Sequence, residues 1–137
     1  MPELLEHGGT VPLWAGWAVT LPAAYHERNA DGSWSAWGAD WAVDVTIIEV
    51  GSAPDGQPAA PDALLGPKGV ANFSGDGWVG CWELRQERDG GRDVLRFATT
   101  LAATNTVMSC WVSVITQEQL DFARQLVASI TNRPAAR

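Results

Sequence analysis

Residues 31–50 read DGSWSAWGADWAVDVTIIEV, and this stretch decides the fold. The odd positions from 37 to 47 are all apolar, whereas the even positions between them are small or polar. A period of two is typical of a β-strand with one buried face and one wet face. A helix would instead place Asp44 on the same face as Trp37 and Trp41. The stretch therefore predicts a strand with Trp41 in the core and Trp37 at its margin.

Trp34 has the opposite parity and lies next to the turn sequence NADGS. It therefore either faces solvent or belongs to a separate short strand. A ring that is presented flat on a surface can stack on sugars, bases or the side chains of a partner. We expect Trp34 and Trp37 at the rim of the sheet, and together with Trp14 they are the candidate binding residues. The alternation places four other indoles inward: Trp17, Trp41, Trp78 and Trp82.

Further strands follow the same logic. WAVTL at 17–21 alternates before Pro22, and WVGCWELRQE from Trp78 alternates before the turn sequence RDGGRD. Asp-Gly between alternating runs predicts a hairpin. VLRFATTLAA then returns, TN makes a second turn, and TVMSCWVSVI is apolar on both faces, as expected for a central strand. These segments predict an antiparallel meander.

A helix is predicted after the last strand. Thr116 and Gln119 have the spacing of a capping box. The apolar residues that follow recur at helical spacing, so one side of the helix should pack on a sheet. Those residues are Leu120, Ala123, Val127 and Ile130, with Phe122 and Leu126 beside them. The predicted fold class is therefore α+β, with an antiparallel sheet of five to six strands and a C-terminal helix packed across one face.

The length of 137 residues fits one domain, residues 1–137. Periodicity fades between residues 51 and 77, where four prolines and several glycines make an irregular segment. The segment is longer than the roughly 12–15 residues that a structureless loop usually reaches. It has the character either of a lid or binding loop or of an insertion without a role, and the sequence leaves both readings open.

The amino-acid composition limits the classes of partner that the protein can bind. The net charge of −7 argues against nucleic acid and against an anionic membrane surface. No run of 18 apolar residues is present, and the acidic start MPELLEHGGT does not match a secretion signal. We therefore expect a cytoplasmic protein. The richness in Ala, Gly, Trp and Arg is typical of a GC-rich bacterial genome.

Catalytic and metal-binding motifs are sparse. His7 and His26 are the only histidines, and no metal-ligand spacing is present, so neither a metal nor a cofactor is expected. A Ser-His-Asp arrangement is recognised only in space, and His26 would be its most plausible base. Asp40 and Asp44 could do acid–base work, although carboxylates on the wet face of a strand usually serve solvation. Cys81 and Cys110 are read as buried free thiols.

The layout resembles the PsbP-like family of small α+β domains. The likeness rests on an early strand that ends in VTLP, a Pro/Gly-rich middle, a hairpin meander and the closing run CWVSVITQEQLDFARQLVASI. The resemblance implies an accessory or binding protein, such as an adaptor or chaperone in bacterial secretion. It implies no catalytic residues in this chain.

The sequence therefore predicts a non-catalytic binding or adaptor domain with a protein partner, of which a symmetric homodimer would be one form. One alternative is a Trp-lined module for a small ligand or carbohydrate, which should show a concave pocket with Trp14, Trp34 or Trp37 in its wall. The second alternative is an unrecognised hydrolase, which needs a nucleophile within hydrogen-bond reach of a base.

Overall fold

A computed structural model describes residues 4–5, 9–21, 25–30, 32–49 and 73–133. The strands formed by these residues range in length from two to twelve residues. The strands are β1 (Leu4–Leu5), β2 (Gly9–Pro12), β3 (Trp17–Leu21), β4 (Tyr25–Ala30), β5 (Ser33–Trp37), β6 (Trp41–Glu49), β7 (Phe73–Gly75), β8 (Trp78–Asp89), β9 (Arg92–Ala103), β10 (Thr106–Val114) and β11 (Thr131–Asn132). A 3₁₀ turn, Gln117–Gln119, leads into the helix α2, Leu120–Ala128.

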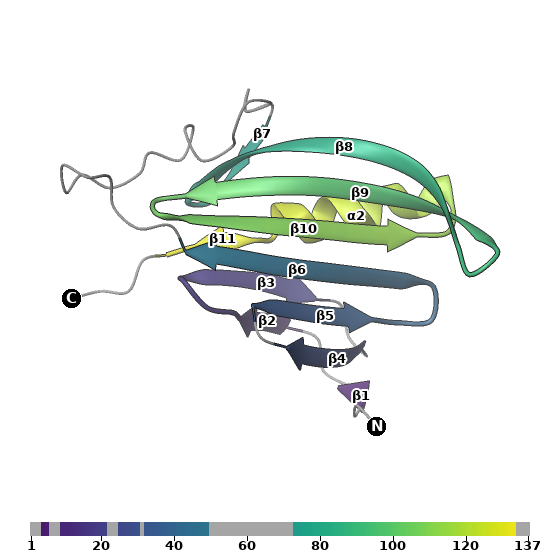
Figure 1. Ribbon diagram of the computed structural model, residues 1–137, viewed down its shortest axis with the longest axis horizontal. Coiled ribbons are helices and arrows are strands. Elements are labelled where there is room, and N and C mark those ends of the chain that lie inside the picture. The colour runs from purple at the N-terminus through teal and green to yellow at the C-terminus, as the bar shows by residue number, and fades with distance from the viewer. Residues whose placement is uncertain (1–3, 6–8, 22–24, 31, 50–72, 134–137) are drawn as a thin grey trace.

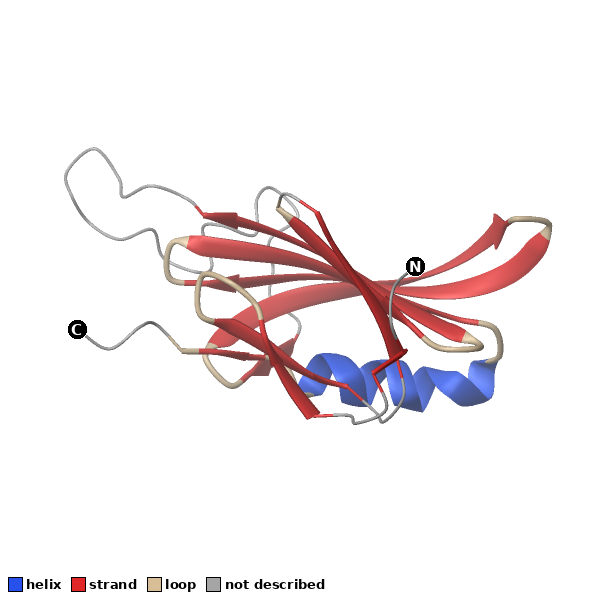
Figure 2. Ribbon diagram, turned by 90° about the horizontal axis from the view of Figure 1, so that it is seen from below, coloured by secondary structure: helices blue, strands red, loops and turns tan. Residues whose placement is uncertain are grey.

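The strands form two antiparallel sheets. The large sheet has the order β1-β4-β5-β6-β10-β9-β8-β7, and the small sheet has the order β11-β3-β2. The small sheet and α2 lie on the same side of the large sheet (Figures 1 and 2). We call this side the inner face and the opposite side the outer face. Among the described residues, no helix or strand covers the outer face.

The predicted fold class is wrong. The described chain is mostly β, with an eight-stranded sheet, a second three-stranded sheet and one short helix, instead of an α+β fold with five to six strands. The elements that the sequence did not reveal are short or polar. β4, for example, reads YHERNA and is exposed along its second half. An alternating pattern marks a strand only where enough of its residues are buried on one face.

A turn at residues 38–40 divides the stretch that was expected to be one strand. The amide N–H of Gly38 donates to the carbonyl oxygen of Trp41 at 3.0 Å, and this bond closes the hairpin between β5 and β6. The turn resets the parity of the side chains. Trp34 consequently faces inward from β5, whereas Trp37 faces the outer side, which is the reverse of the expected arrangement.

The second half of the chain forms the expected hairpins. β8 and β9 join at Gly90–Gly91, and β9 and β10 join at Asn105, whose φ of 61° suits the tight turn. The predicted capping box of Thr116 and Gln119 is present, and the Gln119 side chain accepts a hydrogen bond from the Thr116 amide at 2.9 Å. Buried residues of α2 and of both sheets form one apolar core.

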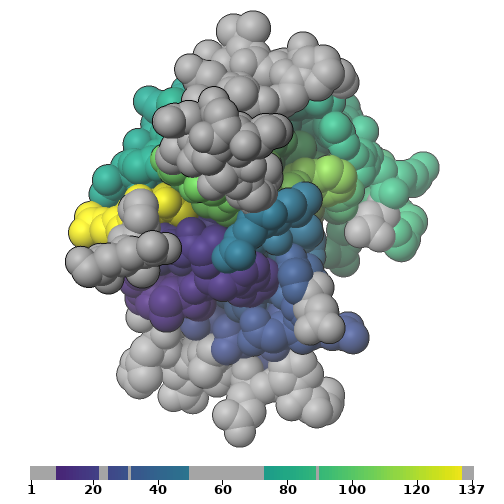
Figure 3. Space-filling view, turned by 60° about the vertical axis from the view of Figure 1, so that its left-hand side comes forward, coloured from purple at the N-terminus to yellow at the C-terminus, as the bar shows by residue number. Residues whose placement is uncertain are grey.

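Buried hydrogen bonds hold the layers together. The Trp17 indole of β3 donates to the Thr106 hydroxyl of β10 at 2.9 Å. The Trp78 indole of β8 donates to the carbonyl oxygen of Ile130 at 2.8 Å. Figure 3 shows the C-terminal segment, in yellow, against the purple strands of the small sheet. Each indole therefore fills the core and also fixes the distance between layers.

The irregular segment expected at 51–77 lies mostly outside the described residues. Its last part is ordered, because Phe73–Gly75 forms β7 and pairs with Trp78–Gly80 of β8. Asp76 then makes a parallel bridge to Thr131. This bridge connects the edge of the large sheet to β11.

Candidate functional site

Trp34 is not a surface residue. Its side chain is 1% exposed, and its indole N–H donates to Glu27 Oε2 at 3.0 Å. The expectation that Trp34 is exposed at the rim of the sheet is therefore wrong. The alternative, in which Trp34 belongs to its own short strand, holds for β5.

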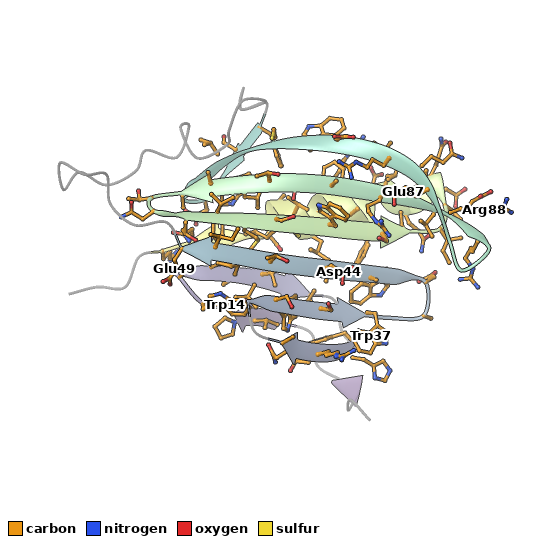
Figure 4. The ribbon with its side chains drawn as sticks, in the orientation of Figure 1. Trp14, Trp37, Asp44, Glu49, Glu87 and Arg88 are labelled. Carbon is orange, nitrogen blue, oxygen red and sulfur yellow. The ribbon has the colours of Figure 1, made fainter. Side chains whose placement is uncertain are left out.

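The other two candidate indoles lie far apart. Trp37 is half-buried on the outer face and stacks on His26, with ring centroids 5.7 Å apart and planes 19° from parallel. Trp14 is half-buried and packs against the core from the turn before β3. Figure 4 shows Trp14 to the left of β5 and Trp37 near the right-hand end of that strand. The three predicted binding residues therefore do not form one site.

The exposed indole is Trp82, which the sequence placed in the core. It has the expected parity, because it pairs with Thr99 and lies on the inner face with Trp78. Nevertheless Trp82 is 39% exposed and Leu84 is 42% exposed. Of the other three indoles that were predicted to face inward, Trp17 and Trp78 are buried. Trp41 is half-buried and packs against the core beside Phe122.

An apolar groove continues from Trp82 toward the helix. We call it the β8–α2 groove. It has a volume of about 260 Å³ and is lined by Phe73, Ser74, Trp78, Trp82, Phe97, Arg124 and Ala128. The aromatic rings of its walls pack in pairs. The ring centroids of Phe73 and Trp78 lie 5.0 Å apart in an edge-on arrangement, and those of Trp82 and Phe97 lie 5.3 Å apart.

The position of the groove follows from the length of the strands. β8 has twelve residues and spans about 40 Å at the usual rise of a strand. α2 has nine residues and spans about 14 Å. The helix therefore cannot cover the whole inner face of the β8–β9 hairpin. The sequence does contain a signal for the exposure of Trp82: the predicted strand that carries it is longer than the helix that covers this face.

A second hollow lies at the end of the sheet where β5 turns into β6. Its volume is about 320 Å³, and its wall includes Trp37, Asp40, Trp41, Arg92 and Ser113. It is the place where one predicted binding indole meets a pocket. Its lining combines rings with charged and hydroxyl groups, whereas the β8–α2 groove is mainly apolar.

The outer face carries a cluster of charges around Trp111. The guanidinium carbons of Arg85 and Arg96 lie 5.2 and 5.4 Å from the Trp111 ring centroid. Arg96 also pairs with Glu87, and its Nε donates to the Ser113 hydroxyl at 3.1 Å. The cluster therefore connects side chains of β8, β9 and β10 across the outer face.

The described residues show no cluster of metal ligands. In that part of the chain, no group of three His, Cys, Asp or Glu side chains could hold a metal ion. His26 contacts the Trp37 ring, and none of the described serines or cysteines is hydrogen-bonded to it. Asp44 accepts a hydrogen bond from the Ser35 hydroxyl at 2.8 Å. His7 lies outside the described residues.

The two thiols lie on opposite faces of the sheet. Cys110 is fully buried, and burial raises the pKa of its thiol to about 12. Cys81 is half-buried and faces the outer side with Thr100. The expectation of a buried thiol is confirmed for Cys110 and only partly met for Cys81.

No helix in the described part of the chain has the length and apolarity needed to cross a membrane. No protein-family model matches the sequence, and no curated protein matches it either. A crystal structure of a protein from Bacteroides thetaiotaomicron VPI-5482 is similar, with a TM-score of 0.66 and 14% sequence identity. The match covers 89% of this chain and 47% of that chain, so this chain spans about half of its length. At this identity the similarity shows the fold alone.

Proposed function

We propose that this chain is a non-catalytic binding domain whose β8–α2 groove holds an apolar side chain of a protein partner. The observation that carries the proposal is the exposure of Trp82 and Leu84 beside the groove. Apolar side chains that cluster on a surface mark interaction sites, whereas single ones are ordinary. Tryptophan is also enriched among the residues that dominate binding energy in interfaces.

The size and charge of the groove favour a side chain over a whole cofactor. Its volume of about 260 Å³ lies below the roughly 300–1,000 Å³ that is usual for pockets of drug-sized ligands. Arg124 stands at its margin with 57% of its side chain exposed and a distant contact to Asp121 at 4.0 Å. The guanidinium can therefore donate hydrogen bonds to a carboxylate or a carbonyl oxygen that lies next to the apolar group.

Anilinonaphthalene sulfonate is a suitable probe, because it joins an apolar ring system to an anion. We expect its fluorescence to rise with the wild-type protein. Ala128→Phe should weaken binding because Ala128 is exposed and lines the groove, so a larger ring fills the groove without disturbing the core. Arg124→Gln should weaken binding of the sulfonate.

The matched control is Ile48→Ser. Ile48 is 58% exposed, but it belongs to β6 and does not line the groove. This substitution should leave probe binding unchanged. Equal binding by the wild type, Ala128→Phe and Arg124→Gln would contradict the proposal.

A Trp-lined module for a small ligand or carbohydrate is the second candidate. The hollow beside Trp37 supports it, because rings and polar groups that converge on one site are typical of sugar-binding surfaces. Titration with a panel of oligosaccharides, followed by tryptophan fluorescence, tests this function. A response that Trp37→Ala abolishes and Ala128→Phe preserves would favour it over the groove.

A further inference from the structure

In the described part of the chain, the edge of the large sheet at β8 is open over most of its length. β7 pairs with β8 only along Trp78–Gly80. Among the described residues, no strand lies beside Cys81–Asp89 on that side. An edge of this kind presents backbone N–H and C=O groups that can pair with another chain.

The residues along this edge alternate in two ways. Trp82 and Leu84 extend from the inner face and are exposed, whereas Glu83 and Arg85 extend from the outer face. Glu83 and Arg85 form an ion pair within the chain, with Arg85 Nε 2.8 Å from Glu83 Oε1. The strand therefore offers an apolar row on one face and opposite charges, two positions apart, on the other.

We propose that the β8 edges of two copies of this chain pair antiparallel about Leu84, so that their large sheets form one continuous sheet. A two-fold axis perpendicular to the sheet keeps inner side chains opposite inner ones. Leu84 then lies opposite Leu84 of the second copy. Glu83 of each copy lies opposite Arg85 of the other, because these residues are equally distant from the axis. The proposal stands independently of the groove's ligand.

Charge complementarity selects this register. Pairing about Arg85 would place two guanidinium groups opposite each other, and pairing about Glu83 would do the same with two carboxylates. Like charges directly opposite each other destabilise paired strands, whereas opposite charges and apolar pairs stabilise them. Pairing about Gln86 would set Leu84 against Arg88. The register about Leu84 avoids these conflicts and extends the intrachain ion pair into an alternating set of charges.

The geometry of the hairpin permits this pairing. In the proposed register, Cys81 lies opposite Glu87 of the second copy, so the paired segment is residues 81–87. Beyond it, the second copy would meet β7, which occupies the edge at Trp78–Gly80. The tip of the β8–β9 hairpin curves away from the helix (Figure 2), and in the proposed pairing this curvature directs the tip of one copy away from β7 of the other.

The expected dimer depends on concentration. One strand from each copy makes a small interface, and interfaces below about 1,200 Å² are usually weak or transient. Sedimentation velocity across a dilution series should therefore show exchange between monomer and dimer in the wild-type protein. A wild-type protein that stays a monomer at every concentration would overturn the proposal.

Charge reversal tests the register. Glu83→Arg alone and Arg85→Glu alone each place like charges opposite one another, so each should weaken dimerisation by at least about tenfold. Mixing the two variants should restore a dimer, because the reversed charges are then complementary between copies. The double variant Glu83→Arg with Arg85→Glu should also dimerise as the wild type does.

Three controls keep the result clear. Circular dichroism melting shows whether each variant folds. The double variant keeps an ion pair between residues 83 and 85, so it controls for the loss of that intrachain contact in the single variants. Arg88→Glu, which lies outside the paired segment, should dimerise as the wild type does. Because Glu83 and Arg85 face away from the β8–α2 groove, probe binding should survive their reversal. Dimerisation that is unaffected by the single reversals, or a mixture that stays monomeric, would overturn the proposed pairing.

Discussion

The indole of Trp34 donates a hydrogen bond to Glu27 Oε2 at 3.0 Å across the β4–β5 hairpin. The two residues face the inner side of the large sheet, where Trp34 is 1% exposed. A carboxylate that would otherwise be solvated thus satisfies the polar atom of a buried ring. This contact explains why a large indole lies next to an exposed turn and still belongs to the core.

Trp34→Ala should lower the free energy of unfolding by about 3–5 kcal/mol, the range for deletion of a large buried aromatic side chain. Glu27→Ala should cost about 1 kcal/mol, because it leaves the indole N–H without this acceptor while solvent still reaches the half-buried Glu27 position. Urea unfolding measures both values. A cost below about 0.5 kcal/mol for Trp34→Ala, as expected of a surface residue, would contradict the buried position.

Trp17→Ala and Trp82→Ala should differ although the substitution is the same. Trp17 is 1% exposed and hydrogen-bonded to Thr106, so its truncation should cost about 3–5 kcal/mol. Trp82 is 39% exposed, so its truncation should cost about 1 kcal/mol. Urea denaturation of the pair provides the comparison. Equal losses would mean that the β8–α2 groove is closed in solution.

Gly77→Ala should be more destabilising than Gly90→Ala. Both glycines have positive φ, 88° and 60°, so an added Cβ strains the backbone at either position. At Gly77 the Cβ would also overlap the carbonyl oxygen of Asn132, whereas at Gly90 it would meet open space. We expect a further loss of about 1–3 kcal/mol at Gly77 from this clash. Thermal unfolding of the two variants tests the difference.

Stability should fall at alkaline pH because of Cys110. Burial raises the pKa of its thiol from 9.0 to about 12, so the stabilising contribution is complete below pH 9 and is lost as pH rises from 9 toward 12. The slope for one thiol is about 1.4 kcal/mol per pH unit. Urea unfolding of the wild type and of Cys110→Ala across this range isolates the effect, and Cys81→Ala serves as the control. Parallel pH profiles for wild type and Cys110→Ala would contradict the raised pKa.

Strands with one deeply buried face were visible in the sequence. β10 alternates between buried and half-buried positions along its whole length, and its hairpin with β9 turns at Asn105 as expected. β4 was missed because its second half, Arg28–Ala30, is exposed. A strand of this kind is held by backbone hydrogen bonds and shows no alternation of apolar and polar residues in its sequence.

The candidate site was harder to predict, because the exposure of its indoles depends on the turn at residues 38–40 and on the length of α2. The turn at residues 38–40 lies inside a run that alternates between apolar and polar residues, so the alternation continues through it. Because of the turn, Trp34 faces the inner side and Trp37 the outer side. Trp82 has a core residue's parity, and only the shortness of α2 leaves it exposed. The alternation along a strand predicts which face of the sheet a side chain lies on. Whether that side chain is exposed to solvent depends on how far the helix layer extends over the face.

The small sheet has a consequence for how the protein is made. β3, at residues 17–21, pairs with β11 at residues 131–132, and the Asn132 side chain donates to the carbonyl oxygen of Ala15 across 117 positions of sequence. A ribosome therefore releases the first strands long before their last neighbour exists. Contacts this distant in sequence slow folding, and β3, with its buried Trp17, has no β11 partner until residues 131–132 have been synthesised. We therefore expect the small sheet to be completed among the last steps of folding.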